Sequence, residues 1–144
     1  MRALAPALAL FLALAGCAGG GNAATGAIPG SAWVVERIVQ ADGAVVRGSG
    51  ASVQFGRDGS VFVEACNACN GRFRVRGGTL RVDEALACTR RACAPGGAPE
   101  VGPLLGGDHS IARDGQYLVL TQAVGDGAAA QQILLLPATA QTDG

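Results

Sequence analysis

Apolar and polar residues alternate along much of the chain, and this pattern predicts short β-strands rather than helices. The alternation is strictest in segments 72–76 and 79–83, where apolar residues occupy every second position. A period of two is typical of a strand with one buried face. Gly77-Gly78 separates the two segments and favours a tight hairpin turn. We therefore expect a hairpin whose outer face carries Arg72, Arg74, Arg76 and Arg81.

Further segments rich in β-forming residues surround this hairpin. They cover residues 33–39, 53–55, 61–65, 116–122 and 131–136. Segment 94–108 is rich in Gly and Pro and predicts a loop, with one short helical turn at 100–105 that Pro103 limits. About seven short strands without a long amphipathic helix predict a mainly β fold. We expect a small antiparallel β-barrel-like domain with one short helix, and two packed sheets are the alternative architecture.

Residues 1–16 are interpreted as a secretory signal that ends in a lipid-attachment motif. Met1-Arg2 supplies positive charge, and the apolar run that follows is too short to span a bilayer. Leu14-Ala15-Gly16-Cys17 resembles the bacterial lipobox at every position. That resemblance implies acylation of the Cys17 thiol and cleavage before it, so the membrane is the expected partner through the N-terminal lipid. Because Ala18 is not Asp, the same resemblance favours the outer membrane, facing the periplasm.

The remaining chain is long enough for one domain. Removal of residues 1–16 leaves 144 − 16 = 128 residues. Residues 17–30 are mostly small and are expected to form a flexible tether between lipid and domain. The β domain is expected to span residues 31–138, and residues 139–144 are expected to form a loose tail.

The charge balance excludes a strongly basic or acidic protein. All 11 basic residues are Arg, and 11 acidic residues bring the formal net charge to zero. Such a chain has no basic field for a nucleic-acid backbone, so no nucleic-acid partner is expected. The outward arginines of the hairpin are interpreted as solvating charges on an exposed sheet face. Contact of these arginines with lipid phosphate or an anionic glycan is the alternative.

Once Cys17 is assigned to lipid, an even number of cysteines remains. These are Cys66, Cys69, Cys88 and Cys93. In an exported domain they favour two structural disulfides, for which three pairings are possible. One alternative is a zinc-stapled binding module, because C-x2-C-x18-C-x4-C resembles a zinc ribbon whose last pair is too widely spaced. The other is a thiol–disulfide redox protein that uses the C-x-x-C pair, although a strand rather than a helix follows it.

The residues show no arrangement typical of an enzyme. His109 is the single His and lies in Gly107-Asp108-His109-Ser110, which we interpret as a surface turn. No nucleophile motif accompanies this His, and the glycine-rich segments lack the Lys of a phosphate loop. We therefore expect no catalytic residue, no metal site and no cofactor.

The middle of the chain resembles the META domain of HslJ-type bacterial lipoproteins. Cys66-Asn67, followed after three residues by Gly71-Arg72-Phe73, resembles the family element G-C-N-x-x-x-G-x-Y/F, with Ala65 in place of the first Gly. Segment 89–93 resembles the element T-x-M-A-C, with Arg91 in place of Met. Segments 31–33 and 115–120 resemble the family's opening S/T-x-W and its late strand G-x-x-L-x-L.

This resemblance implies a small β-barrel with one short helix, in which Asn67, Gly71 and Thr89 are family-motif residues. No enzyme activity is established for the family. The resemblance therefore implies a non-enzymatic, accessory or stress-related role in the cell envelope, with an envelope protein of unknown identity as a possible partner.

The resemblance also implies a disulfide pairing. The cysteine pair shared by the family corresponds here to Cys66 and Cys93. Cys69 and Cys88 are additional to that pair, and they would then be joined to each other inside the longer bridge.

Overall fold

A computed structural model describes residues 27–122 and 130–138. The expected signal at 1–16, most of the tether and the tail at 139–144 lie outside these residues. Among the described residues, no helix has the length and apolar character needed to cross a bilayer. The elements, in order, are β1 (Ser31–Val39), β2 (Val45–Arg47), β3 (Ser52–Phe55), β4 (Ser60–Glu64), β5 (Ala68–Arg76), β6 (Thr79–Val82), β7 (Ala87–Cys88), α2 (Val101–Leu105), β8 (Gly107–Asp114), β9 (Tyr117–Gln122) and β10 (Gln131–Pro137).

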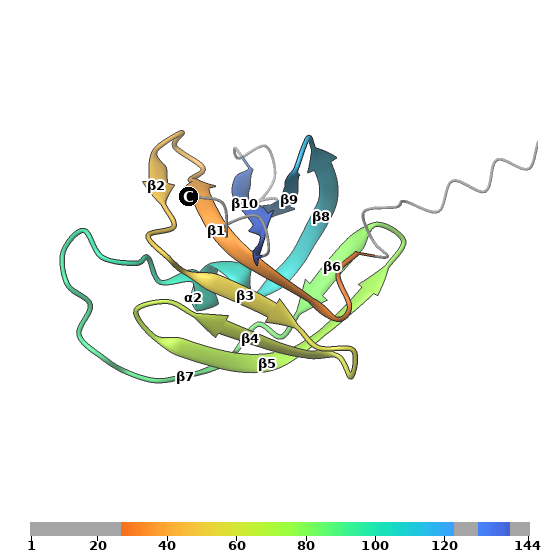
Figure 1. Cartoon of the computed structure of the whole chain (residues 1–144), viewed down its shortest axis with the longest axis horizontal. Helices are drawn as coiled ribbons and strands as arrows, with labels where there is room; N and C mark the ends of the chain where they lie inside the picture. Colours follow the sequence, from red (N-terminus) through yellow and green to blue (C-terminus); the bar gives the residue numbers. More distant parts are fainter. Residues whose placement is uncertain (1–26, 123–129, 139–144) are drawn as a thin grey trace, which may run out of the picture.

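Eight antiparallel strands close into a barrel (Figure 1). Their order around the wall is β1-β3-β4-β5-β6-β8-β9-β10, and β10 pairs again with β1. The closing ladder joins Trp33 to Pro137 at one end and Val39 to Gln132 at the other, and its register shifts between Val35 and Arg37. The short strands β2 and β7 pair with β1 and β5. The structure thus confirms the mainly β, barrel-like fold with one short helix.

The hairpin expected at residues 72–83 is present, and β3 and β4 form a second hairpin. β3 and β4 are joined by a turn in which the Asp58 carboxylate accepts hydrogen bonds from the Ser60 hydroxyl and N–H, at 2.6 and 3.0 Å. These two hydrogen bonds, the hydroxyl bond first, lower the pKa of Asp58. β5 and β6 are joined by Gly77 and Gly78, with φ of +54° and +82°. A two-residue turn with two positive φ angles matches strand twist, and Gly adopts it without steric cost.

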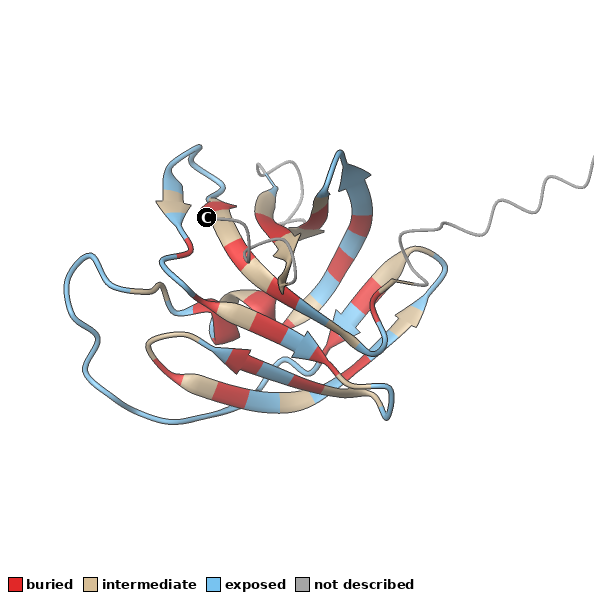
Figure 2. Ribbon diagram, in the orientation of Figure 1, coloured by how far each residue is buried: buried red, intermediate tan, exposed pale blue. Residues whose placement is uncertain are grey.

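Side chains fill the interior of the barrel. Buried and exposed residues alternate along the strands, as Figure 2 shows. Phe55 and Phe73 meet edge to face, with ring centroids 4.9 Å apart. An eight-stranded barrel is just wide enough for its inward side chains to pack against one another. The inward residues that are at most 1% exposed include Val53, Phe55, Val61, Val63, Leu80, Leu118, Leu120, Ile133 and Leu135.

Strand β8 is not among the expected strands, because segment 94–108 predicts a loop and residues 107–110 predict a surface turn. β8 begins at Gly107 and pairs with β6 and β9. The prediction of a surface turn around His109 is therefore wrong. His109 occupies an inward position of β8 and is 1% exposed. A polar residue at an inward position interrupts the apolar alternation on which strand prediction depends.

The folded domain also begins earlier than the expected boundary at residue 31. Ile28 was assigned to the flexible tether, but its side chain is fully buried in the core. The Ser31 hydroxyl donates to the Ile28 carbonyl, and the Gly30 N–H donates to the Phe55 carbonyl at 2.7 Å. An isolated Ile among Ala, Gly and Pro has no periodic pattern, so no local signal indicates its burial.

We predict that Ile28→Ala destabilises the domain by about 2–5 kcal/mol, because it removes buried methyl groups and leaves a cavity. Urea unfolding followed by the fluorescence of the single Trp, Trp33, measures this change. Val45→Ala is the control, since Val45 is 60% exposed and its truncation should change the free energy of unfolding by less than about 0.5 kcal/mol. Equal stability of Ile28→Ala and the wild type would place Ile28 in the tether after all.

Candidate functional site

The four cysteines of the domain form two nested disulfides. Cys66 is joined to Cys93 and Cys69 to Cys88, which is the pairing implied by the family resemblance. The bridges span 27 and 19 residues, and in the chain-entropy model either bridge closed alone contributes about 3–4 kcal/mol. Cys66 and Cys69 are not joined to each other, so the C-x-x-C pair does not make the bridge that thioredoxin-type exchange uses. The sulfurs of Cys66 and Cys69 are bonded instead to Cys93 and Cys88, which lie on the segment that contains β7.

Asn67 is the centre of the site, and its side chain uses all of its hydrogen-bonding capacity. Its carbonyl oxygen Oδ1 accepts from the Arg91 N–H at 2.6 Å and from the Thr89 hydroxyl at 3.0 Å. Its amide Nδ2 donates to Glu100 Oε1 at 2.6 Å and to the Arg91 carbonyl at 3.3 Å. The side-chain amide of Asn offers two donors and two acceptor positions, and all four are filled. Asn67 is only 7% exposed. A polar side chain can be buried in this way because its hydrogen-bonding groups all have partners.

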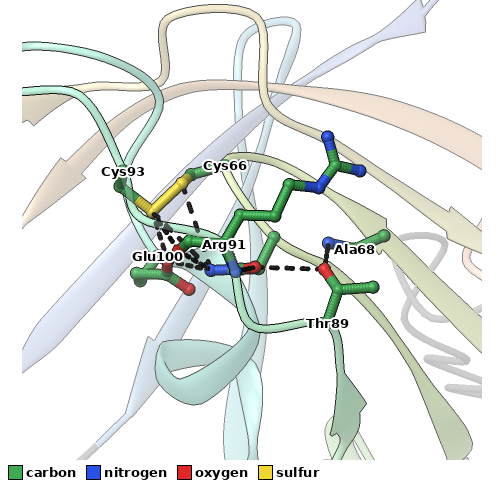
Figure 3. Close-up of a disulfide and its surroundings, with 7 residues drawn as sticks. Cys66, Ala68, Thr89, Arg91, Cys93 and Glu100 are labelled. Carbon is green, nitrogen blue, oxygen red and sulfur yellow. Dashed lines mark hydrogen bonds between the residues drawn. A yellow bond between two sulfur atoms is a disulfide. The ribbon is translucent and has the colours of Figure 1, made fainter.

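The disulfide and the hydrogen bonds belong to one cluster. Figure 3 shows the Cys66–Cys93 bridge, Thr89, Arg91 and Glu100 converging on this point. The Cys93 sulfur lies 2.7 Å from Glu100 Oε1 and 3.6 Å from the amide nitrogen of Asn67. The Thr89 hydroxyl also accepts from the Ala68 N–H at 3.0 Å, which ties the cluster to the first residue of β5. We call these residues the Asn67 cluster: Cys66, Asn67, Thr89, Arg91, Cys93 and Glu100.

Two glycines allow close packing beside this cluster. A Cβ atom at Gly71 would collide with the side chain of Leu86, which covers β5 at that point. A Cβ atom at Gly102 would collide with the Cys69 sulfur, so the second bridge packs directly against α2. The motif position Gly71 therefore has a steric role: it lets the segment between β6 and β7 lie on the barrel wall.

A metal site at the cysteines is not available while the bridges are closed. The sulfurs of Cys66 and Cys93 and a carboxylate oxygen of Glu100 lie within 4.8 Å of one another. Thiolates are the zinc ligands, however, and both sulfurs are bonded to each other. Cys69 and Cys88 are not part of that group. The zinc-ribbon interpretation therefore requires reduction of both bridges and a rearrangement of the segment that carries them.

Comparison with protein families agrees with this geometry. The META domain family matches residues 26–135, which is 110 of the 144 residues. The chain belongs to the META domain family. The matched range begins before β1 and so includes the buried Ile28, which the expected boundary at residue 31 left out.

One solved structure is similar to the META domain described here. It is the NMR structure of a protein from Burkholderia xenovorans, with a TM-score of 0.55 and 22% sequence identity. The similarity covers 78% of this chain and 86% of that one. At this identity the match supports the fold alone. No curated protein sequence matches the chain.

The opening motif of the META domain has a clear structural role in this chain. The indole N–H of Trp33 donates to the Ser31 hydroxyl at 2.6 Å, and that hydroxyl donates to the Ile28 carbonyl. Trp33 is 3% exposed, and the Arg113 guanidinium lies over its ring, 5.1 Å from the centroid. The Ser and Trp of this motif therefore hold the first residues of the domain against the barrel.

Glu100 is the member of the Asn67 cluster that sequence reasoning missed. It was noticed only as the start of a possible helical turn, and it does lie immediately before α2. Its contact with Asn67 spans 33 residues, so no local spacing indicates it. The backbone groups of Arg91 were equally beyond prediction, because they depend on the course of the segment after β7.

His109 lies outside the Asn67 cluster, at the junction of α2 and β8. Its Nε2 donates to the Leu105 carbonyl at 2.8 Å, while its Nδ1 has no partner among the described residues. Burial lowers the pKa of His109 below the ordinary value of 6.5, against the opposing effects of backbone carbonyls and Asp108. A buried neutral His that fastens the end of α2 is a structural group, since substrate cannot reach it.

We predict that Asn67→Ala destabilises the domain by about 2–4 kcal/mol, because buried donors and acceptors that bonded to Asn67 lose their partner. Urea unfolding under oxidising conditions measures the change. Asn70→Ala is the matched control, since Asn70 is an exposed residue of β5 and its loss should be nearly neutral. Similar effects of the two substitutions would show that the Asn67 cluster does not stabilise the fold.

We further predict that stability falls as the pH drops from 7.5 to 5.5. The folded state binds a proton at His109 less readily than the unfolded state, so unfolding takes up a proton below about pH 6.5, with a slope of up to about 1.4 kcal/mol per pH unit. His109→Gln removes the chain's single His, and its unfolding free energy should be flat over this range. Parallel pH curves for the variant and the wild type would contradict the prediction.

Proposed function

We propose that the protein is a non-enzymatic, lipid-anchored META-domain protein of the cell envelope that acts by binding another envelope component through its surface. The observation that carries this proposal is the structural use of the Asn67 side chain, whose four hydrogen-bonding positions are all filled by other residues of the domain. Its amide, hydroxyl, carboxylate and sulfur groups contact one another, and the Asn67 side chain at their centre is buried. The motif that distinguishes the family is thus built here to hold the fold.

The packed barrel supports the same proposal. Small barrels that bind ligands do so in an open, apolar interior, whereas the interior of this barrel is occupied by its own side chains. Three grooves on the described surface lie against the outer faces of strands and loops. Contact at the surface is therefore the mode of action that the architecture favours.

The proposed location rests on the sequence and on the two bridges. The lipobox-like segment at 14–17 would attach lipid to Cys17, and the absence of Asp at position 18 would direct the protein to the outer membrane. Disulfides form and persist in oxidising compartments, which adds weak support for a location outside the cytoplasm. An accessory or stress-related role would follow from an anchored module that binds neighbouring envelope proteins.

We predict that protein purified from its own envelope without reductant carries acyl chains on Cys17 and two closed bridges. Intact and peptide mass spectrometry, with alkylation before denaturation, would detect both. The Cys17→Ser variant should lose the acyl mass and be released from membranes by a high-salt wash, which screens electrostatic contacts. Cys88→Ser is the matched control for loss of a cysteine, since it opens a bridge and leaves the anchor in place.

Two outcomes would contradict the proposal. An unacylated N-terminus at residue 17, or retention of residues 1–16, would remove the anchor. Free, alkylatable Cys66 and Cys69, or a native mass that includes zinc, would favour the redox or metal-binding alternatives instead.

A further inference from the structure

The outer face of the β5–β6 hairpin carries an unusual concentration of arginines. In the ladder, Arg74 lies directly opposite Arg81 and Arg76 opposite Thr79. All three arginines are exposed. Like charges directly opposite each other on one sheet face destabilise strand pairing. The hairpin therefore keeps an arrangement that does not serve its own stability.

Two adjoining grooves follow this face. One, of about 350 Å³, is lined by Arg74, Arg76, Thr79, Arg81 and Asp108. The other, of about 600 Å³, is lined by Arg72, Phe73, Arg74, Arg81, Val82, Asp83 and Glu84. Arg74 and Arg81 border both grooves, so the two grooves share the arginines of the hairpin face. We call Arg74, Arg76, Thr79 and Arg81 the arginine face.

Nearby carboxylates neutralise only part of this charge. Arg81 and Asp108 form an ion pair of 3.4 Å between Nε and Oδ1, and both side chains are more than half exposed. Among the described residues this is the single ion pair within 4.0 Å, so Arg74 and Arg76 have no carboxylate partner there. Three guanidinium groups therefore face one carboxylate in the first groove.

Exposed guanidinium groups on a shallow surface suit a particular class of ligand. The planar guanidinium binds phosphate oxygens through two parallel hydrogen bonds, and the Thr79 hydroxyl adds a further donor. The grooves are open to solvent along the sheet, so they fit phosphates presented side by side by a flat surface. The anionic headgroups of a bilayer present phosphate in this way.

The arginine face lies at the end of the barrel where the described chain begins. Ser31 of β1 pairs with Phe55, so the N-terminal segment lies beside the β3–β4 turn. The Arg72 guanidinium donates to the Asp58 carbonyl in that same turn, at 2.8 Å. β5 continues beyond Arg72 to the hairpin tip.

The distance from the proposed anchor is short. Between Cys17 and Ala27 lie 27 − 17 = 10 peptide steps, which span at most about 35 Å when fully extended. A lipid on Cys17 would thus hold this end of the barrel near the bilayer, and the high effective concentration would make weak phosphate contacts sufficient.

From these observations we propose that the arginine face docks the domain onto the anionic phosphates of the bilayer in which the chain is anchored. The inference rests on the proposed lipid anchor and specifies which end of the barrel faces the bilayer. Each arginine near an anionic membrane surface strengthens binding roughly fivefold, so three of them give about 100-fold. The interaction is electrostatic and weakens as salt is raised.

The test uses the chain from residue 17 onward with Cys17→Ser, which keeps every described residue and removes the lipid. Cosedimentation is measured with vesicles of phosphatidylcholine alone and with vesicles that also contain phosphatidylglycerol. We expect salt-sensitive binding only to the anionic vesicles. The triple variant Arg74→Gln, Arg76→Gln, Arg81→Gln should bind them about 100-fold more weakly.

A second triple variant is the matched control. Arg47→Gln, Arg90→Gln, Arg91→Gln removes the same charge, and these three arginines are exposed. Arg47 pairs with β1 near its far end, and Arg90 and Arg91 follow β7, away from the hairpin tip. This control should bind like the wild type. The hairpin variant should unfold at the same temperature as the wild type or higher, because it loses the Arg74–Arg81 repulsion.

Several results would overturn the proposal. An equal loss of vesicle binding in both triple variants would show that binding depends on net charge and not on the arginine face. Equal binding to both vesicle types would show that anionic phosphate is not the ligand. Competition by free inorganic phosphate at low millimolar concentration, or binding to an anionic polysaccharide without vesicle binding, would identify a different ligand. Because the chain tested carries no lipid, its result is independent of whether Cys17 is acylated, which mass spectrometry decides separately.

Discussion

The pairing of β1 with β10 closes the barrel, and the rest of the structure depends on that closure. β1 is hydrogen-bonded to β10 along one edge and to β3 and β2 along the other. Without the closing ladder, both strands would be sheet edges with unpaired backbone groups, and their inward side chains would face water. Closure also orients the residues before β1, so that Ile28 can reach the core.

The segment between β6 and β8 lies outside the closed barrel wall. Between β6 and β8 the chain forms only β7 and α2, with few ladder hydrogen bonds to hold it. Two disulfides and the hydrogen bonds of Asn67 replace the missing ladder. Cys66 and Cys69 lie at the start of β5, and Cys93 and Cys88 lie on the segment outside the wall, so the nested pairing attaches that segment at two adjacent points.

The sequence predicted those parts of the fold that follow from local alternation. The β5–β6 hairpin and the short helical turn were predictable because apolar periodicity, the Gly77-Gly78 turn and Pro103 are local signals. β8 was missed because its inward position 109 is a His, whose burial requires the Leu105 carbonyl of α2 as a partner. Resemblance to a family indicated Asn67, but its partner Glu100 lies 33 residues away, and only the closed barrel brings the two together.

The barrel separates two kinds of surface at its two ends. The bridges and the Asn67 cluster hold one end, where the Asn67 side chain is buried among its hydrogen-bond partners. The arginine face lies at the other, where like charges are held opposite each other by the register of β5 and β6. A rigid ladder presents these guanidinium groups at fixed spacing, so little backbone entropy is lost when they bind. If the hairpin end faces the bilayer, the end with the loop between β7 and α2 points away from it. That loop, fastened by the Cys66–Cys93 bridge and exposed along most of its length, is then the surface that an envelope partner would meet first.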